Sequence, residues 1–217
     1  MKNSERFYNR IRWYLDSVEQ ITSEYNDAVS RAKQYEGSTG GKALVDQATS
    51  ARDTAMRGER ETAVKAIREI IGSMRENARA RKITAPTQEQ LAILQALKMR
   101  QKVNKDEIKQ AENSLKSCPL ALSVLDEIAQ SNGIIRTGKR EAMTTDYILQ
   151  RIDSLEQSAL AMLRGDSARL SRAPADVGEC LTRFGGFSYC VADDGMTTSI
   201  DTGTISKFCE VIDGRGD

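Results

Sequence analysis

The chain has 217 residues, of which 39% are hydrophobic, 5% aromatic and 29% charged. This composition lies on the polar side of the globular range and favours elongated helices with narrow apolar stripes over a sandwich or a doubly wound sheet. The 32 basic and 31 acidic residues nearly cancel, to a net charge of +1, so no sequence-wide attraction to nucleic acid is expected. Histidine is absent, which excludes histidine-based catalytic triads and histidine-ligated metal sites.

The first long helix is predicted over about residues 4–36. Its apolar residues alternate spacings of four and three, a pattern typical of a stripe that a neighbouring helix covers. This stripe, the first seam, consists of Phe7, Ile11, Tyr14, Val18, Ile21, Tyr25, Ala28, Ala32 and Tyr35. The same stretch holds six of the eleven aromatic residues, so we expect it to dominate stability. Replacing Ile21 with Ala is then expected to cost about 2 to 5 kcal/mol if that side chain is buried.

Glycines at positions 37, 40 and 41 interrupt the helical pattern and predict a reversal of the chain. A second long helix follows over about residues 42–82, so residues 1–84 are expected to form a long helical hairpin. The second seam repeats the four-three spacing at Ala63, Ile67, Ile70 and Met74. The segment from Gly37 to Lys42 superficially resembles a phosphate loop, but it is one residue short and lacks the hydroxyl that would bind magnesium.

The second long helix ends in a basic stretch. It consists of Arg75, Arg79, Arg81 and Lys82. Basic residues complement the negative end of a helix dipole, which is the simpler interpretation. Docking of an anionic partner is the alternative, and both remain open at this point.

Residues 85–135 are predicted to form a cluster of three short helices. Thr87 with Gln90, and Asn104 with Glu107, have the spacing of capping boxes, and Pro119 suits the first turn of a third helix. A helix-turn-helix reader of DNA would use residues 121–130 as its recognition helix. That segment carries only acidic charges, Asp126 and Glu127, so it offers little to phosphates or base edges. Nucleic acid is therefore not expected as a partner.

A third long helix is predicted within residues 136–165, packing on the hairpin. Its seam includes Ile148, Ile152 and Leu155. The three seams can close on one another within the chain or across subunits. We expect self-association, because together they offer more apolar stripe than a single monomeric bundle needs.

Beyond a linker at residues 166–177, residues 178–217 are expected to form a small β-rich appendage that recognises a partner. Apolar and polar residues alternate around residues 187–191, and a turn at Asp193 and Gly195 leads to a threonine-rich segment. Its aromatic residues join the basic stretch as candidates for docking a partner: Phe187, Tyr189 and Phe208. Cys180, Cys190 and Cys209 lack paired zinc-ligand spacing, so free thiols are favoured over a metal site.

No nucleophile motif, metal-ligand pattern or cofactor motif occurs in the chain, so a non-enzymatic protein without a cofactor is predicted. No apolar run approaches the roughly 18 residues that a membrane-spanning helix needs. The N-terminus also lacks the apolar core of a signal peptide. A cytoplasmic protein is therefore expected.

The stretch TQEQLAILQALKMRQKVNKDEIKQAENSLKSCPLALSVLDEIAQSNGI, residues 87–134, follows the heptad-rich N-terminal half. It resembles uncharacterised proteins of tailed bacteriophages and prophages of Gram-positive hosts, some of them encoded among virion-assembly genes. The resemblance covers about residues 50–134. It implies a phage protein in the host cytoplasm or associated with the virion, and it implies no catalytic or binding residue.

Two functions follow as hypotheses. The first is a scaffold-like or capsid-associated assembly protein that oligomerises through its seams and docks on coat or portal protein. The second is a phage-encoded binder that antagonises a host defence protein or sequesters a small signalling molecule. Its site would combine residues 79–105 with the C-terminal region.

Overall fold

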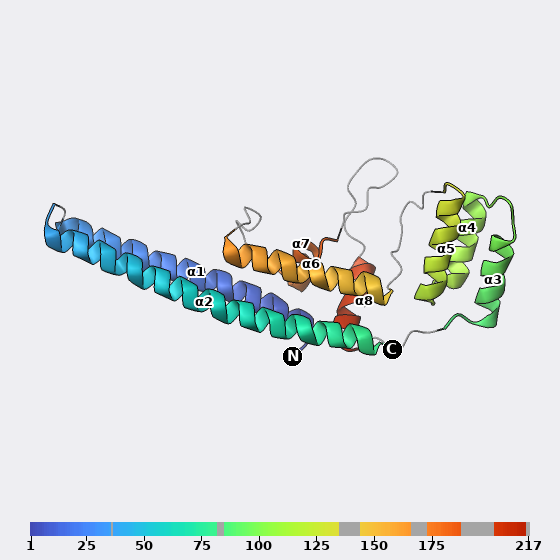
Figure 1. Cartoon of the computed structure of the whole chain (residues 1–217), viewed down its shortest axis with the longest axis horizontal. Coiled ribbons are helices and arrows are strands. Elements are labelled where there is room, and N and C mark those ends of the chain that lie inside the picture. The colour runs from blue at the N-terminus through green and yellow to red at the C-terminus, as the bar shows by residue number, and fades with distance from the viewer. Residues whose placement is uncertain (36, 82–84, 135–143, 166–172, 188–201, 216–217) are drawn as a thin grey trace. The chain divides into compact units, whose positions relative to one another are not determined.

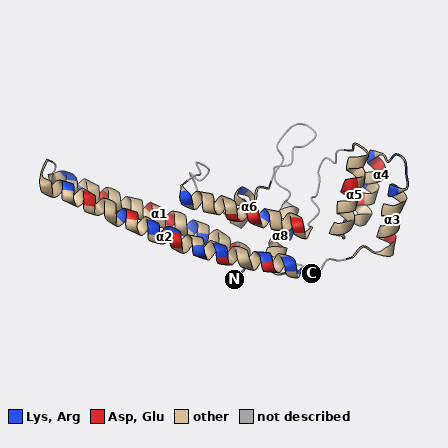
Figure 2. Ribbon diagram, in the orientation of Figure 1, with Lys and Arg blue, Asp and Glu red and all other residues tan. Residues whose placement is uncertain are grey.

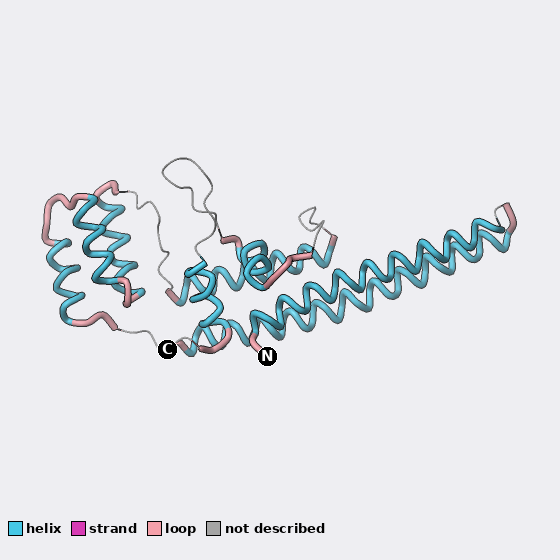
Figure 3. The backbone as a smooth tube through the Cα atoms, turned by 180° about the vertical axis from the view of Figure 1, so that it is seen from behind, coloured by secondary structure: helices cyan, strands magenta, loops and turns pink. Residues whose placement is uncertain are grey.

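The computed structural model describes residues 1–35, 37–81, 85–134, 144–165, 173–187 and 202–215. All regular structure in these ranges is helical, as Figures 1 and 3 show, so the predicted mainly α class is confirmed. The helices are α1 (Asn3–Ala32), the short 3-10 helix η1 (Lys33–Tyr35), α2 (Thr39–Ala80), α3 (Gln88–Lys98), α4 (Lys105–Leu115), α5 (Pro119–Ser131), α6 (Thr145–Arg164), α7 (Val177–Gly185) and α8 (Thr202–Ile212).

The chain divides into two compact units. The first contains residues 1–73 and 154–185, and the second contains residues 74–153 and 186–217. The boundaries fall inside α2 and α6, so both helices contribute to both units.

In the first unit, α1 and α2 run antiparallel as the predicted hairpin (Figure 1). The Asn3 side-chain amide donates a hydrogen bond to the Ser73 hydroxyl at 3.0 Å, which ties the start of α1 to α2. Asn3 and Ser4 are buried in the first turn of α1, and Lys2 occupies its N-cap position. The buried amide with its hydrogen bond therefore fixes the register at this end of the hairpin.

The turn of the hairpin requires glycine at two positions. Gly37 has φ +83°, a left-handed conformation that glycine adopts without strain. A Cβ atom on Gly41 would lie 2.4 Å from the carbonyl oxygen of Tyr35. The glycines that were predicted to reverse the chain therefore do so, and at Gly41 the reason is the close approach of the two helices.

We predict that Gly41→Ala destabilises the hairpin, whereas Gly58→Ala stabilises it. The added methyl at residue 41 meets backbone, which cannot move without opening the turn. Gly58 lies within α2 with no atom within 4 Å of a Cβ, so alanine there should gain up to about 1 kcal/mol of helix propensity. Thermal unfolding followed by circular dichroism tests both, and stabilisation by both alanines would contradict this account of the turn.

The base of the hairpin is the core of the first unit. Phe7 and Ile11 on α1 and Ile67 on α2 have no exposed surface. The Phe7 ring meets the Phe184 ring of α7 edge to face, with centroids 5.9 Å apart. The Tyr14 hydroxyl donates a hydrogen bond of 3.5 Å to the carbonyl oxygen of Leu163 on α6. Two elements therefore cover the hairpin, the C-terminal end of α6 and the helix α7. They reach along α1 only to about Tyr14.

The second unit contains the predicted cluster of three short helices, α3, α4 and α5, which pack on one another. Both predicted capping boxes are present: the Gln90 amide nitrogen donates to Thr87 Oγ1 at 3.2 Å, and the Glu107 amide nitrogen donates to Asn104 Oδ1 at 2.9 Å. Their shared core consists of Leu94, Leu97, Val103, Ile108, Ala111, Leu115, Cys118, Ala121, Leu122, Leu125, Ile128 and Ala129.

The described part of the C-terminal region differs from the predicted β-rich appendage, because it forms α7 and α8. The buried residues of α7, Cys180, Leu181 and Phe184, have helical spacing. The buried residues of α8 also have helical spacing: Phe208, Val211 and Ile212. The predicted strands lie almost wholly in residues 188–201, outside the described residues. The helix α7 is also not part of a separate appendage, because α7 packs on α1 within the first unit.

Burial determines the state of the Cys180 thiol. Its surroundings in α7 are apolar, and this desolvation raises the pKa of Cys180 to about 12. The thiol therefore stays protonated near neutral pH. Cys118 is also a buried thiol and Cys209 a half-buried one, and neither forms a disulfide among the described residues. These three thiols agree with the prediction of no disulfide, while Cys190 lies outside the described residues.

Candidate protein interface

Burial along the hairpin is uneven. On α1 no residue between Tyr14 and Ala32 is buried, and on α2 none is buried between Gly41 and Ala63, although the structure describes every residue of both stretches. The two helices nevertheless run side by side along this length (Figures 1 and 3). We call residues 15–35 and 37–62 the arm. At 1.5 Å per residue, its roughly 20 residues on each helix extend about 30 Å.

The inward face of α2 explains why so little of the arm is buried. Its buried and half-buried positions recur every eleven residues, at Gly41, Arg52 and Ala63 and at Val45, Met56 and Ile67. Eleven residues make three turns of a nearly straight helix. Within the arm this face presents small or polar residues at several positions, including Gly41 and Arg52. The four-three spacing begins only at Ala63, so the eleven-residue spacing was the sequence signal for this part of α2, and it was missed.

An ion pair lies where the core gives way to the arm. Arg10 Nη2 is 2.6 Å from Glu59 Oε1, and the Arg10 side chain is only 9% exposed. The Arg10 guanidinium also lies over the Trp13 ring, 5.4 Å from its centroid, while Trp13 itself is 66% exposed. The Nε of Arg10 is buried and has no hydrogen-bond partner among the described residues. A charged pair thus occupies a position where a seam would place apolar side chains.

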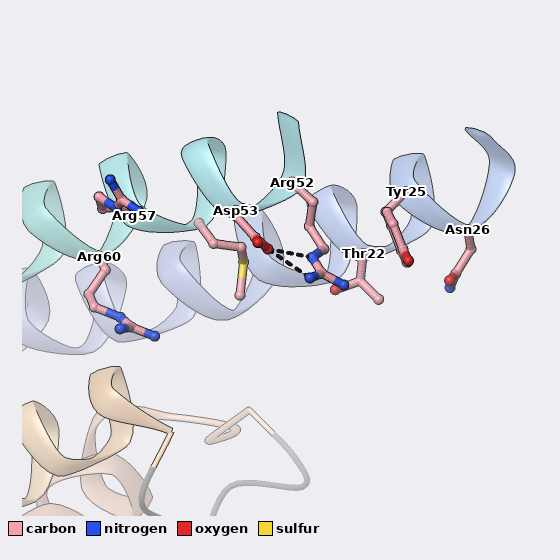
Figure 4. Close-up of a pocket in the computed structure, with 8 residues that line it drawn as sticks. Thr22, Tyr25, Asn26, Arg52, Asp53, Arg57 and Arg60 are labelled. Carbon is pink, nitrogen blue, oxygen red and sulfur yellow. Dashed lines mark hydrogen bonds and ion pairs between the residues drawn. The ribbon is translucent and has the colours of Figure 1, made fainter. Parts of the chain in front are cut away.

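A shallow groove of about 600 Å³ runs along one side of the arm. Figure 4 shows side chains from both helices around it. Arg52 stacks on Tyr25, with its guanidinium carbon 4.5 Å from the ring centroid, and pairs with Asp53 at 2.7 Å. Hydrogen bonding to Asp53 is the main cause that raises the pKa of Arg52. The groove is lined by Thr22, Tyr25, Asn26, Arg52, Asp53, Met56, Arg57 and Arg60.

Most of the predicted oligomerisation residues are core residues of a single chain. Those that are buried are Phe7, Ile11, Tyr14, Ile67, Ile70, Met74, Ile148, Ile152 and Leu155. Because they have little or no exposed surface, they are not available to a second copy, which corrects their predicted role. Val18, Ile21 and Tyr25 differ, since they lie in the arm and are half-buried.

The predicted docking residues are largely engaged within the chain. Arg75 pairs with Asp153 at 2.7 Å, within the second unit. Phe187 and Phe208 are buried and meet edge to face, with centroids 5.2 Å apart, so neither is an open docking residue as predicted. Arg79 is exposed and Arg81 is half-buried, whereas Lys82 and Tyr189 lie outside the described residues. Of the residues that line the groove, only Tyr25 was among the predicted interface residues.

In the described ranges, no group of three or more His, Cys, Asp or Glu residues is placed to hold a metal ion. No helix in these ranges is long and apolar enough to cross a membrane. Acidic and basic residues are instead spread along both helices of the hairpin (Figure 2).

The described residues thus form helices, among them a two-helix arm with a groove along one side. Comparison of the chain with protein-family models, with curated proteins and with solved structures gave no match.

Proposed function

We propose that this protein is a non-enzymatic assembly protein that oligomerises and binds other proteins through its helices. The observation that supports the proposal is the absence of any buried residue over residues 15–31 and 42–62, all of which are described. A hairpin that ended at its core would need only the part of each helix around Phe7 and Ile67. The remaining length serves contact with another molecule.

The physical reason is that helices in proteins are stabilised mainly by packing of an apolar face. In a pair of helices, each helix covers only one stripe of the other. On α2 the covered stripe includes the charged residues Arg52 and Glu59. Further helices laid against the arm would bury its half-exposed apolar residues and give a helical bundle or coiled coil across chains. The same reasoning supports the expectation of a homo-oligomer.

The resemblance of residues 50–134 to proteins of tailed phages gives this activity a context. In that context the protein acts in the host cytoplasm or on the virion. The partner is then a coat or portal protein of the phage. A host protein is the partner under the alternative hypothesis of a defence antagonist.

Sedimentation of the full chain over a wide range of concentrations tests the proposal. The mass is expected to rise with concentration while the helical circular-dichroism signal stays constant. A single monomeric mass throughout would overturn it. Co-purification from infected cells then separates the contexts, because coat or portal protein supports assembly, whereas one host enzyme or a retained small molecule favours the alternative.

A further inference from the structure

We infer that the groove side of the arm is the self-association surface and that its occupant is the arm of a second copy. In this dimer the two arms point the same way, and α1 of each copy packs against α2 of the other. The inference rests on the proposed function and specifies which surface joins the copies. Three observations carry it: the apolar residues beside the groove, the register of the hairpin, and the charges along its two rims.

The α1 rim of the groove carries an apolar stripe. Thr22 lines the groove, and Leu15 and Val29 lie seven residues before and after it, which places all three on one face of the helix. Leu15 and Val29 are half-buried, as is Met56 across the groove. These residues offer a second helix an apolar surface that the first unit leaves partly open.

The register of the hairpin determines which rim residues lie level with each other. Asn3 bonds to Ser73 at one end, and Tyr35 touches Gly41 at the other. In the antiparallel pair, this register places Glu19 level with Arg57. It also places Lys33 within about one turn of the level of Asp46.

The charges on the two rims are complementary at these levels. Glu19 and Lys33 each lie seven residues from the groove residue Asn26, so they share the α1 rim. Asp46 lies seven residues before Asp53, which places it on the α2 rim with Arg57. Packing α1 of one copy on α2 of the other therefore sets Glu19 against Arg57 and Lys33 near Asp46. Packing α1 on α1 would instead place each charged residue opposite the same residue of the second copy, near the two-fold axis.

A two-fold axis parallel to the arm produces this arrangement. Both copies use the same surface, so the contact closes as a dimer. Every helix then has antiparallel neighbours, as in an up-and-down four-helix bundle. A face about 30 Å long and about 20 Å wide buries about 600 Å² per copy, and the total of about 1,200 Å² is at the low end for specific interfaces.

Charge reversal tests the pairing in the full chain. Glu19→Arg alone and Arg57→Glu alone are each expected to raise the dimer dissociation constant about tenfold or more, because like charges then meet twice per dimer. An equimolar mixture of the two variants is expected to form a heterodimer with affinity near that of the unmodified chain. In the mixture the arginine introduced into the first variant faces the glutamate introduced into the second. The unchanged Glu19 of the second variant likewise faces the unchanged Arg57 of the first.

The mixture separates contact between chains from contact within one chain, since each variant chain alone carries like charges at the two positions. Glu24→Arg is the matched control: Glu24 is an exposed acid five residues from Glu19, about 140° around α1, and should leave dimerisation unchanged. Sedimentation equilibrium measures all five samples: the unmodified chain, the two single variants, their mixture and the control. If the unmodified chain associates but the single variants associate equally well, or the mixture gains nothing, this surface is wrong while the proposed function stands. If the unmodified chain stays monomeric, both fail.

Discussion

Phe7→Ala is expected to lower the free energy of unfolding by about 3 to 5 kcal/mol, whereas Ile21→Ala should lower it by only about 1 kcal/mol. Both residues belong to the first seam and have equivalent positions in its four-three spacing. Phe7 has no exposed surface and packs edge to face on Phe184, so its removal leaves a cavity at the base of the hairpin. Ile21 lies in the arm and is half-buried, so water already reaches part of its side chain.

Chemical denaturation monitored by circular dichroism measures both effects. Low protein concentration is needed, so that self-association does not add to the stability of the arm. Similar large losses for the two variants would contradict the uneven burial of the hairpin. The expectation of about 2 to 5 kcal/mol for Ile21→Ala depended on full burial and is replaced by the smaller value.

Glu59→Ala is expected to cost about 2 to 3 kcal/mol, because it leaves the Arg10 guanidinium buried without its carboxylate. The Arg10 side chain is 9% exposed and that of Glu59 is 22% exposed, so solvent compensates only part of the loss. Replacing both residues with methionine should recover most of the stability, since a buried ion pair contributes little over a well-packed apolar pair.

Thermal or chemical unfolding of the single and double variants tests the role of this pair. Glu61→Ala is the matched control, because Glu61 is an exposed acid two residues further along α2. A double variant that is less stable than Glu59→Ala would contradict the interpretation of the pair as a desolvated charge. Equal effects at Glu59 and Glu61 would show that Glu59 is not paired in solution.

Much of the helical framework could be predicted from the sequence because local signals determine where helices begin and end. The capping boxes at Thr87 and Asn104 and the glycines of the hairpin turn were predicted from such signals. The helical class follows from them, because the four-three spacing is itself a helical period. These features depend on residues within a few positions of one another.

The helix α7 was not predicted because its local signals conflict. Cys180, Leu181 and Phe184 have helical spacing, but α7 has only nine residues and is flanked by glycines. Short helices of this kind are stabilised mainly by tertiary packing, here of Phe184 on Phe7. The alternation after Phe187 was the stronger pattern in the sequence.

The candidate interface was not predicted because periodicity does not report how many neighbours a helix has. The first seam runs from Phe7 to Tyr35 without a change in spacing, yet only its first part meets α6 and α7. The groove residues became recognisable only when the two helices were set in register. Arg52 and Glu59, polar residues on the inward face of α2, were the available sequence signal for the arm.

Hydrogen exchange of backbone amides, measured on the full chain at low and at high concentration, tests the central claim most directly. Amides in residues 15–31 and 42–62 are expected to exchange more slowly as the protein associates, because the second copy covers the arm. Amides in α3, α4 and α5 should keep the same rates and serve as the internal control. Association that leaves the rates in the arm unchanged, with slower exchange elsewhere in the chain, would contradict the claim.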